Sequence, residues 1–369
     1  MIKEIYIDNY KCLVNFRINP EAFQLWLGDN GTGKTSILDA LRAIQRTLSG
    51  DHLEDIYTKA SLTTWERRRE QTFSVNLEIA GESYEYKLVI EHGRQNLQCR
   101  IKEESLVWKG KIFFLFDGSD AHLFRVNRNT GDIEEGAKFS ADWNRSIIST
   151  IAERDDNKAL IRFREEVRKW LIIQPVPLVV KQVAEIESRT LTRHAENFAQ
   201  WYRHILQENP GIAYKARENL KEVLPGFEGL SLKDSGDSRK LTATFRIKGE
   251  DQPSGFDILS DGQRQLIVLY TIIESLRNKD YSVLLVDEPD NFVSLREIQP
   301  WITTLEDICG SPSAQSVIIS HHPEIINKMA RGQEIWFSRP DGAHVITKPY
   351  PTTEGLTPAE TMARGWDDE

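Results

Sequence analysis

The sequence predicts an α/β fold with a mixed, largely parallel sheet and helices on both of its faces. Two observations lead to this prediction. A short apolar strand, a glycine-rich loop and an amphipathic helix follow one another within residues 23–48. In the final third of the chain, helical patterns alternate with short apolar strands, as they do in parallel sheets. An antiparallel, strand-rich lobe and a helical insertion are expected between these regions.

Strands dominate the expected structure of the N-terminal part. Apolar residues alternate over residues 2–7 and 13–18, and residues 23–27 form a short apolar run. A helix is expected over residues 36–48, where apolar residues recur at helical spacing. Further strands are expected at 73–79, 84–90, 97–101 and 112–116.

The middle of the chain is predicted to be mainly helical, with helices over residues 160–171, 179–206 and 213–223 and strands at 230–232 and 241–247. In the last third the expected order is helix 266–276, strand 283–286, helix 295–308, strand 316–319, helix 324–329 and strand 334–337. These patterns divide the chain into a first lobe at 1–150, a helical insertion at 151–226, a continuation of the first domain at 227–347 and a tail at 348–369.

The composition, with 40% apolar and 28% charged residues, is typical of a globular protein. Because there is no signal-peptide core at the N-terminus and no apolar run long enough to cross a bilayer, we expect a cytoplasmic protein with no membrane partner. Three widely spaced cysteines indicate neither disulfides nor a zinc site. A net charge of −9 argues against nucleic acid binding over the whole surface. Beside Trp65, residues 67–69 are three arginines, which a solvent-exposed surface explains more simply than a nucleic acid site.

The segment from Gly28 to Thr35 matches the pattern G-x-x-x-x-G-K-[ST] between an expected strand and an expected helix. In that context glycines allow backbone N–H groups to converge on phosphate oxygens, and the helix start adds a positive dipole end. Lys34 is expected to reach the β- and γ-phosphates, and the Thr35 hydroxyl to bind Mg²⁺. The sequence thus predicts a nucleoside triphosphate site formed by Gly28, Asn30, Gly31, Gly33, Lys34, Thr35 and Ser36.

A second motif follows the apolar run 283–286, which ends in Asp287 and Glu288. Ligands bind at the carboxyl ends of strands in open α/β sheets. Asp287 is expected to hold Mg²⁺ together with Thr35, and Glu288 to orient or deprotonate the attacking water. An apolar strand ending in two acidic residues is common on its own, but together with the glycine loop it indicates catalysis.

The third motif, Leu259-Ser260-Asp261-Gly262-Gln263, precedes the expected helix 266–276. Ser260 followed three residues later by Gln263 is a capping box, which any helix can use for stability. A helix start with Gly262 can instead meet a phosphate group. The spacing in the sequence does not choose between these interpretations.

The order of these motifs resembles that of ABC-type P-loop ATPases in the branch of the RecF, SMC and OLD-like proteins. LSDGQ at 259–263 resembles the LSGGQ-type signature of that family. Residues 318–323 (IISHHP) resemble the strand of the switch histidine, and residues 7–11 (IDNYK) resemble the opening of RecF and SMC heads. The resemblance runs from the first residues to about Pro323. It implies a P-loop NTPase fold with an ABC-type head.

In that family two heads associate head to tail and enclose two ATP molecules. The resemblance therefore implies a homodimer or a higher homo-oligomer, with ATP and Mg²⁺ as cofactors. The glycine loop of one subunit would face Ser260, Gly262 and Gln263 of the other. His321 matches the switch histidine that contacts the γ-phosphate, while His322 occupies a position usually filled by serine.

Two places depart from the family pattern. After Glu288 and Pro289 the chain continues as residues 290–295 (DNFVSL), which differs from the usual D-loop, so the contact of that loop across the dimer is in question. The Q-loop glutamine is not clearly marked by its surroundings. Gln174, between the strand-rich and helical parts, is the candidate and would be a further Mg²⁺ ligand.

The resemblance implies an ATPase, converting ATP and water to ADP and phosphate, that controls a separate effector protein, a nuclease or toxin, in bacterial anti-phage defence. OLD-type nucleases carry a Toprim domain after the ATPase, and the residues after His322 are too few for one. A first alternative is a RecF-like ATPase in DNA repair or maintenance, with nucleic acid as a possible partner. A second is a scaffold stabilised by ATP with negligible turnover.

Overall fold

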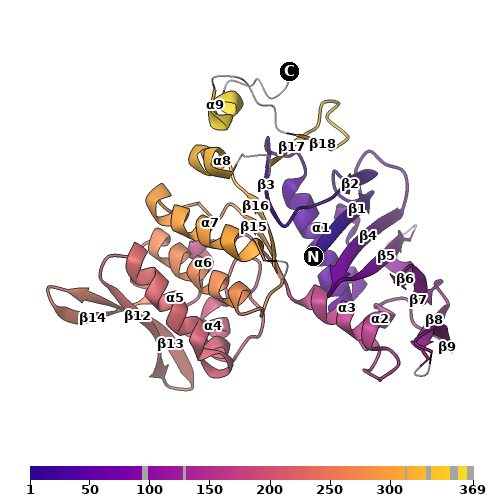
Figure 1. The fold of residues 1–369 in the computed structure, drawn as a ribbon, viewed down its shortest axis with the longest axis horizontal. Coiled ribbons are helices and arrows are strands. Elements are labelled where there is room, and N and C mark those ends of the chain that lie inside the picture. The colour runs from indigo at the N-terminus through magenta and orange to yellow at the C-terminus, as the bar shows by residue number, and fades with distance from the viewer. Residues whose placement is uncertain (94–98, 128–129, 312–313, 330–333, 350–355, 364–369) are drawn as a thin grey trace. The chain divides into compact units, whose positions relative to one another are not determined.

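The computed structural model describes residues 1–93, 99–127, 130–311, 314–329, 334–349 and 356–363. The chain folds into two compact units (Figure 1). Unit 1 contains residues 1–21, 26–170 and 335–349, and unit 2 contains residues 22–25, 171–334 and 350–369. No helix in the described ranges is long and apolar enough to cross a membrane.

Unit 1 is built on an eight-stranded sheet with the strand order β2-β1-β4-β5-β6-β7-β8-β9. Every neighbouring pair in this order is antiparallel. Burial alternates along β4, so one face of that strand lies in the core. The strands are β1 (Ile2–Asp8), β2 (Phe16–Ile18), β4 (Glu70–Ile79), β5 (Glu82–His92), β6 (Cys99–Trp108), β7 (Lys111–Phe116), β8 (Asp120–Val126) and β9 (Ile133–Ser140).

The helices of unit 1 are α1 (Lys34–Ser49), α2 (Ile147–Thr150) and α3 (Lys158–Arg168), with short 3₁₀ turns η1 (Leu53–Asp55) and η2 (Lys59–Ser61) before β4. α1 buries an apolar stripe that includes Ile37, Leu41 and Ile44. Phe163 of α3 packs on Tyr84 and Tyr86 of β5, at ring-centre distances of 6.1 and 5.3 Å. β17 (Glu334–Ser338) and β18 (Ile346–Pro349) form an antiparallel pair.

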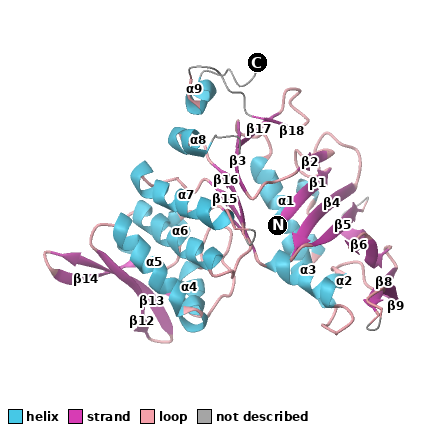
Figure 2. Cartoon of the chain, in the orientation of Figure 1, coloured by secondary structure: helices cyan, strands magenta, loops and turns pink. Residues whose placement is uncertain are grey.

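Unit 2 combines parallel strands with a layer of helices. β15 (Val283–Asp287) and β16 (Gln315–Ile319) are parallel, and Asp287 lies beside Ile319. Helix α6 (Asp261–Arg277) is buried on most sides and contacts α5 (Pro210–Val223) and α7 (Leu295–Cys309). In Figure 2, α4 (Phe198–Glu208) lies with these helices, while α8 (Pro323–Met329) contacts α9 (Pro358–Ala363).

Two further sheets complete the description. β13 (Ser238–Ile247) pairs antiparallel with β11 (Val183–Ala184), β12 (Phe227–Ser235) and β14 (Glu250–Gly255). The six-stranded sheet has the strand order β10-β15-β16-β3-β17-β18, where β10 is Trp170–Ile173 and β3 is Phe23–Gly28. The 3₁₀ turns η3 (Pro177–Val179) and η4 (Phe256–Ile258) lie in unit 2.

The predicted mixed α/β fold is confirmed, but one predicted helix is wrong. Instead of a helix over 179–206, the chain is irregular up to α4, apart from η3 and the short β11. The side chain of Asn197 explains the late start, because it donates to Ser188 Oγ and the Thr190 carbonyl and accepts from the Thr192 N–H. Such side-chain bonds to the backbone compete with a helix.

Other boundaries also differ from the prediction. The helix expected over 160–171 stops at Arg168, and strand β10 follows it. Strands β8 and β9 were not expected. The division into four segments stays a prediction, and residues 350–355 and 364–369 of the expected tail lie outside the described residues.

Candidate functional site

The glycine loop joins β3 to α1 in unit 1. Gly28, Gly31 and Gly33 have φ angles of 135°, 81° and 97°, which residues with a Cβ disfavour. At Gly28 an added Cβ would also lie 2.2 Å from the carbonyl oxygen of Phe337. Glycine is therefore required at this position by both the backbone angle and the space available.

Gly33 is the N-cap residue of α1, and no side chain in the described part of the chain caps this helix start. The first N–H groups of a helix have no acceptor inside the helix, and the helix dipole is positive at this end. Such a helix start suits phosphate oxygens. The expected residues Gly28, Asn30, Gly31, Gly33, Lys34, Thr35 and Ser36 all lie in this loop or in the first turn of α1.

Lys34 is buried, and its ammonium group contacts the loop itself. Nζ donates hydrogen bonds to the carbonyl oxygens of Gly28 and Asp29 and to Thr32 Oγ1, at 2.5, 2.9 and 3.3 Å. A lysine held by neutral oxygens can exchange them for a phosphate anion, which is the stronger, charge-assisted partner. The residues of the loop therefore fit a ligand with several phosphate groups.

Distant parts of unit 1 support the loop. Arg339, after β17, donates from Nη1 to the carbonyl oxygen of Gly31 at 3.1 Å, and its guanidinium lies 5.3 Å from the ring centre of Trp65. Cys12 Sγ donates to Ser36 Oγ at 3.5 Å. Sequence patterns did not indicate Arg339 or Cys12, because both meet the loop only after folding.

The motif at 259–263 lies in unit 2, where it starts helix α6. Ser260 Oγ accepts a hydrogen bond from the Gln263 N–H at 3.3 Å, and Gln263 Oε1 accepts one from the Ser260 N–H at 3.0 Å. The capping box is thus present. A Cβ on Gly262 would lie 2.6 Å from the carbonyl oxygen of Phe292, so close backbone packing also explains this glycine.

Arg264, in the first turn of α6, binds three backbone carbonyls from two segments of the chain. Its guanidinium donates to the carbonyl oxygens of Leu259, Pro177 and Asp257, at 3.0, 3.3 and 2.7 Å. Five rigid N–H donors make arginine suited to several acceptors at once. Arg264 was not a sequence candidate, yet it binds the backbone at the start of the motif and just before it.

Asp287 and Glu288 lie at the carboxyl end of β15, as predicted. Asp287 is 3% exposed. Glu288 has a φ of 51°, its N–H donates to the Ile319 carbonyl at 2.8 Å, and its Oε2 accepts from Asn291 Nδ2 at 2.8 Å. A non-glycine residue in the left-handed region costs about 1–3 kcal/mol, and such strained residues occur at active sites as well as in turns.

His321 and His322 follow β16 in the same unit. The His322 N–H donates to Ser320 Oγ at 3.0 Å, and its Nδ1 accepts from the Glu324 N–H at 3.2 Å, which caps α8. Nδ1 is therefore the unprotonated ring nitrogen.

Burial raises the pKa of Asp290, against the opposing effect of a hydrogen bond from Ser320.

Gln174 directly follows β10 in unit 2. Its Oε1 accepts a hydrogen bond from Arg193 Nη2 at 3.4 Å, and its carbonyl oxygen accepts one from His194 Nδ1 at 2.8 Å.

No group of three or more His, Cys, Asp or Glu side chains in the described ranges is placed to hold a metal ion. Hydroxyl and carboxylate oxygens such as those of Thr35 and Asp287 suit Mg²⁺, which also keeps water and phosphate ligands.

Three comparisons with known proteins agree on the type of protein. An uncharacterised ABC transporter ATP-binding protein of Methanocaldococcus jannaschii is 29% identical over 133 residues, or 35% of this chain and 23% of that protein. The match thus spans less than a quarter of the relative's length. A solved SMC head bound to the C-terminal winged-helix domain of ScpA has a TM-score of 0.56 at 12% identity, covering 94% of this chain and 98% of that one.

An SMC head from Pyrococcus furiosus with an extended coiled coil, bound to the C-terminal domain of ScpA, has a TM-score of 0.51 at 11% identity and covers 100% of this chain and 99% of that one. These structures share the fold. The family model described as "AAA domain, putative AbiEii toxin, Type IV TA system" matches residues 27–327. The chain therefore belongs to that family, and it shares its fold with SMC head domains.

Proposed function

We propose that this protein binds ATP and Mg²⁺ at the glycine loop and hydrolyses the ATP. The observation that carries this proposal is the start of α1, where three glycines with positive φ precede a helix without a side-chain cap and Lys34 contacts the loop carbonyls. Membership of the family supports the same activity.

Each expected residue has a defined part in this proposal. Gly28, Asn30, Gly31, Gly33 and Ser36 shape the loop that binds the phosphates, and Lys34 exchanges its carbonyl partners for them. Thr35 and Asp287 would hold Mg²⁺, with Gln174 as a further ligand, and the metal would neutralise charge on the phosphates. Glu288 orients the attacking water and accepts its proton, while His321 contacts the γ-phosphate.

A second copy of the chain completes the site in this proposal. The capping box uses the Gln263 N–H, but the N–H groups of Asp261 and Gly262 still lie at the start of α6, where a helix provides no acceptor. Ser260, Gly262 and Gln263 of one copy would contact ATP held by the loop of the other. We expect a homodimer or higher homo-oligomer that forms with ATP.

The ATP-dependent dimer would control a separate effector protein, a nuclease or toxin, in cytoplasmic anti-phage defence. The support is indirect: the matched family's description names a toxin system, and the two SMC heads were solved with a bound partner domain. DNA-dependent stimulation of ATP hydrolysis would favour the RecF-like alternative instead. ATP binding without turnover would favour a scaffold.

The test compares the wild type with Lys34→Ala and Glu288→Gln. Wild type should release phosphate from ATP, Lys34→Ala should lose ATP binding, and Glu288→Gln should keep binding and form a dimer with ATP that light scattering detects. Turnover in Glu288→Gln equal to that of the wild type would overturn the catalytic assignment. A monomer at saturating ATP would overturn the dimer.

A further inference from the structure

Unit 1 contains a cavity of about 680 Å³ at one end of its eight-stranded sheet. The cavity lies where β1 and β5 end and β4 begins, and three consecutive arginines, Arg67, Arg68 and Arg69, line it. A cavity of this size suits a ligand as large as a nucleotide. The proposed ATPase mechanism gives no role to these arginines.

The carboxylates that line the cavity are already neutralised. Asp8 accepts hydrogen bonds from Arg68, Glu70 pairs with Lys102 at 2.6 Å, and Glu91 pairs with Arg100 at 2.7 Å. Glu70 and Glu91 each have their own cation, whereas Asp8 shares Arg68 with Glu66. The remaining charge in the lining is positive, since Arg67 and Arg69 add two further guanidinium groups.

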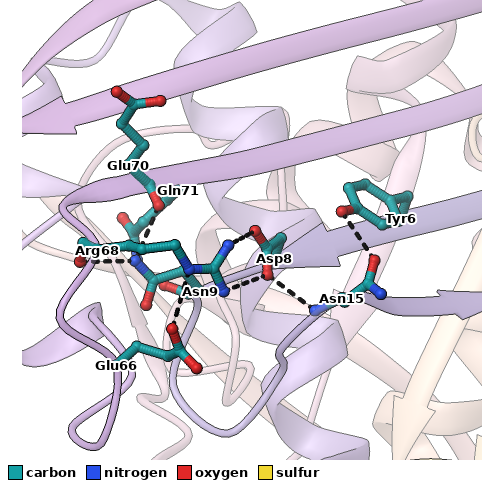
Figure 3. Close-up of polar contacts among 8 residues, drawn as sticks. All are labelled: Tyr6, Asp8, Asn9, Asn15, Glu66, Arg68, Glu70 and Gln71. Carbon is teal, nitrogen blue, oxygen red and sulfur yellow. Dashed lines mark hydrogen bonds and ion pairs between the residues drawn. The ribbon is translucent and has the colours of Figure 1, made fainter.

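Arg68 is occupied by acidic partners, as Figure 3 shows. It binds both carboxylate oxygens of Asp8, and its Nε donates to Glu66 Oε2 at 2.9 Å. These hydrogen bonds raise the pKa of Arg68. Arg68 thus holds residues 66–68 against Asp8, and few of its N–H donors remain for a ligand.

Arg67 and Arg69 differ from Arg68. Both side chains are exposed, and among the described residues neither has an acidic partner or a hydrogen bond. The backbone around Arg69 is nevertheless fixed. Asn9 Nδ2 donates to the carbonyl oxygens of Arg68 and Glu70, at 3.0 and 2.8 Å, and the His92 N–H donates to the carbonyl oxygen of Arg69 at 3.0 Å.

Buried polar groups hold the base of the cavity. Gln71 Nε2 donates to the carbonyl oxygens of Asn9 and Ser61, both at 3.0 Å, so Gln71 Oε1 must accept from His92 Nε2 at 2.8 Å. Burial, and then the nearby Lys59, lower the pKa of His92. The backbone that carries the two arginines is therefore held in place, while their exposed side chains can reach an anion.

We propose that this cavity binds a phosphate-bearing anion of nucleotide size through Arg67 and Arg69. Guanidinium groups match phosphate in charge and geometry and can form two parallel hydrogen bonds with it. The phosphate can belong to a free nucleotide or to the backbone of a nucleic acid strand. The proposal goes beyond the ATPase function and does not depend on hydrolysis.

The experiment uses the full chain with Lys34→Ala, which weakens the glycine loop as a competing site. Binding of pyrophosphate, AMP and a labelled twelve-nucleotide single-stranded DNA is measured at low salt by calorimetry or fluorescence anisotropy. Replacing Arg67 and Arg69 together by Ala should weaken binding by roughly a hundredfold, about tenfold per arginine. Arg67→Lys with Arg69→Lys should keep part of the affinity, because the charge remains without the fork.

Arg125→Ala is the matched control, since Arg125 is an exposed arginine of unit 1 outside the cavity lining. It should leave binding unchanged, and all variants should keep the melting temperature of the parent. Arginine-dependent binding of AMP or pyrophosphate identifies a free ligand, and binding of the oligonucleotide alone identifies a nucleic acid backbone. No binding of any probe, or equal binding by the double Ala variant, overturns the proposal.

Discussion

The starts of α1 and α6 differ in how their backbone N–H groups are satisfied. In α1 the N-cap is Gly33, and no side chain within the described ranges caps the helix. In α6 the N-cap is Ser260, which forms a reciprocal capping box with Gln263. A capped helix start stabilises the fold, while an uncapped one keeps its N–H groups for a ligand. Both motifs suit phosphate by their sequence. Only the α6 motif also satisfies a helix N–H group with its own side chain.

We expect the N–H groups of the glycine loop to rely on a bound ligand for hydrogen bonds more than those of the α6 motif do. In α1 the loop conformation is set by glycine angles and by contacts from Arg339 and Cys12. In α6, Ser260 and Gln263 satisfy each other's backbone N–H groups, and the carbonyl of Phe292 packs closely against Gly262. Substitutions at the two helix starts should therefore separate effects on the stability of the fold from effects on ATP binding and dimerisation.

The largest expected effect is at Gly28. Gly28→Ala should destabilise the fold by on the order of 4 kcal/mol, because a positive φ is combined with a clash at the Phe337 carbonyl. Gly31→Ala is the control, since Gly31 also has a positive φ but its Cβ would meet no atom within 4 Å. It should cost roughly 1–2 kcal/mol. Urea denaturation measures both, and equal losses would contradict the steric argument.

A third helix start, that of α2, is satisfied by a buried carboxyl group. Glu104 is fully buried and accepts from Ser146 Oγ, the Ile147 N–H and Tyr86 OH, at 2.5, 3.1 and 3.0 Å. Burial raises the pKa of Glu104 from 4.5 to about 7. The folded state therefore binds the proton more tightly than the unfolded state, and stability falls as the pH rises from 4.5 through 7.

Glu104→Gln removes this titration. Since a pKa unit corresponds to about 1.4 kcal/mol, the variant should gain up to roughly 3 kcal/mol relative to wild type between pH 4.5 and pH 8. Melting temperatures of both proteins at these two pH values measure the change. An offset between the proteins that does not vary with pH would show that Glu104 keeps an ordinary pKa.

Ser260→Ala tests whether the α6 motif has a role beyond capping. The loss of the cap should cost about 1 kcal/mol in urea denaturation. Ser294→Ala is the control at another helix start, because Ser294 is the N-cap of α7 and its Oγ and N–H both donate to Glu297 Oε2, at 2.6 and 3.0 Å. Both should destabilise similarly, but only Ser260→Ala should reduce ATP-dependent dimerisation. Equal dimerisation by the two variants would leave capping as the sole role of Ser260.

The smallest expected effect on stability is at Glu288. Glu288→Gly should stabilise the fold by roughly 0.5–1 kcal/mol, because glycine adopts a φ of 51° without strain, and it should abolish ATP hydrolysis. Glu288→Gln keeps the strain and should be unchanged in stability. Loss of stability in Glu288→Gly would indicate that the hydrogen bond from Asn291 outweighs the strain.

The sequence predicted the features that depend on neighbouring residues. The glycine loop with its flanking strand and helix, the acidic pair after β15 and the capping box of α6 each lie within a few residues of chain, so their patterns indicate local structure directly. The prediction of a helix over 179–206 was wrong before Phe198, because local side-chain hydrogen bonds decide the structure there. Hydrogen bonds of the Asn197 side chain with the Thr190 carbonyl and the Thr192 N–H replace helical ones there, and apolar periodicity does not detect them.

Tertiary structure alone decided which distant residues meet. Arg339 reaches the Gly31 carbonyl from far along the chain, Gly262 is needed where Phe292 approaches, and the arginine run became a cavity lining only when β1, β4 and β5 paired. These contacts depend on packing and strand pairing between remote segments, for which a linear pattern carries no signal. The sequence by itself thus determined the phosphate loop, and the fold determined what surrounds it.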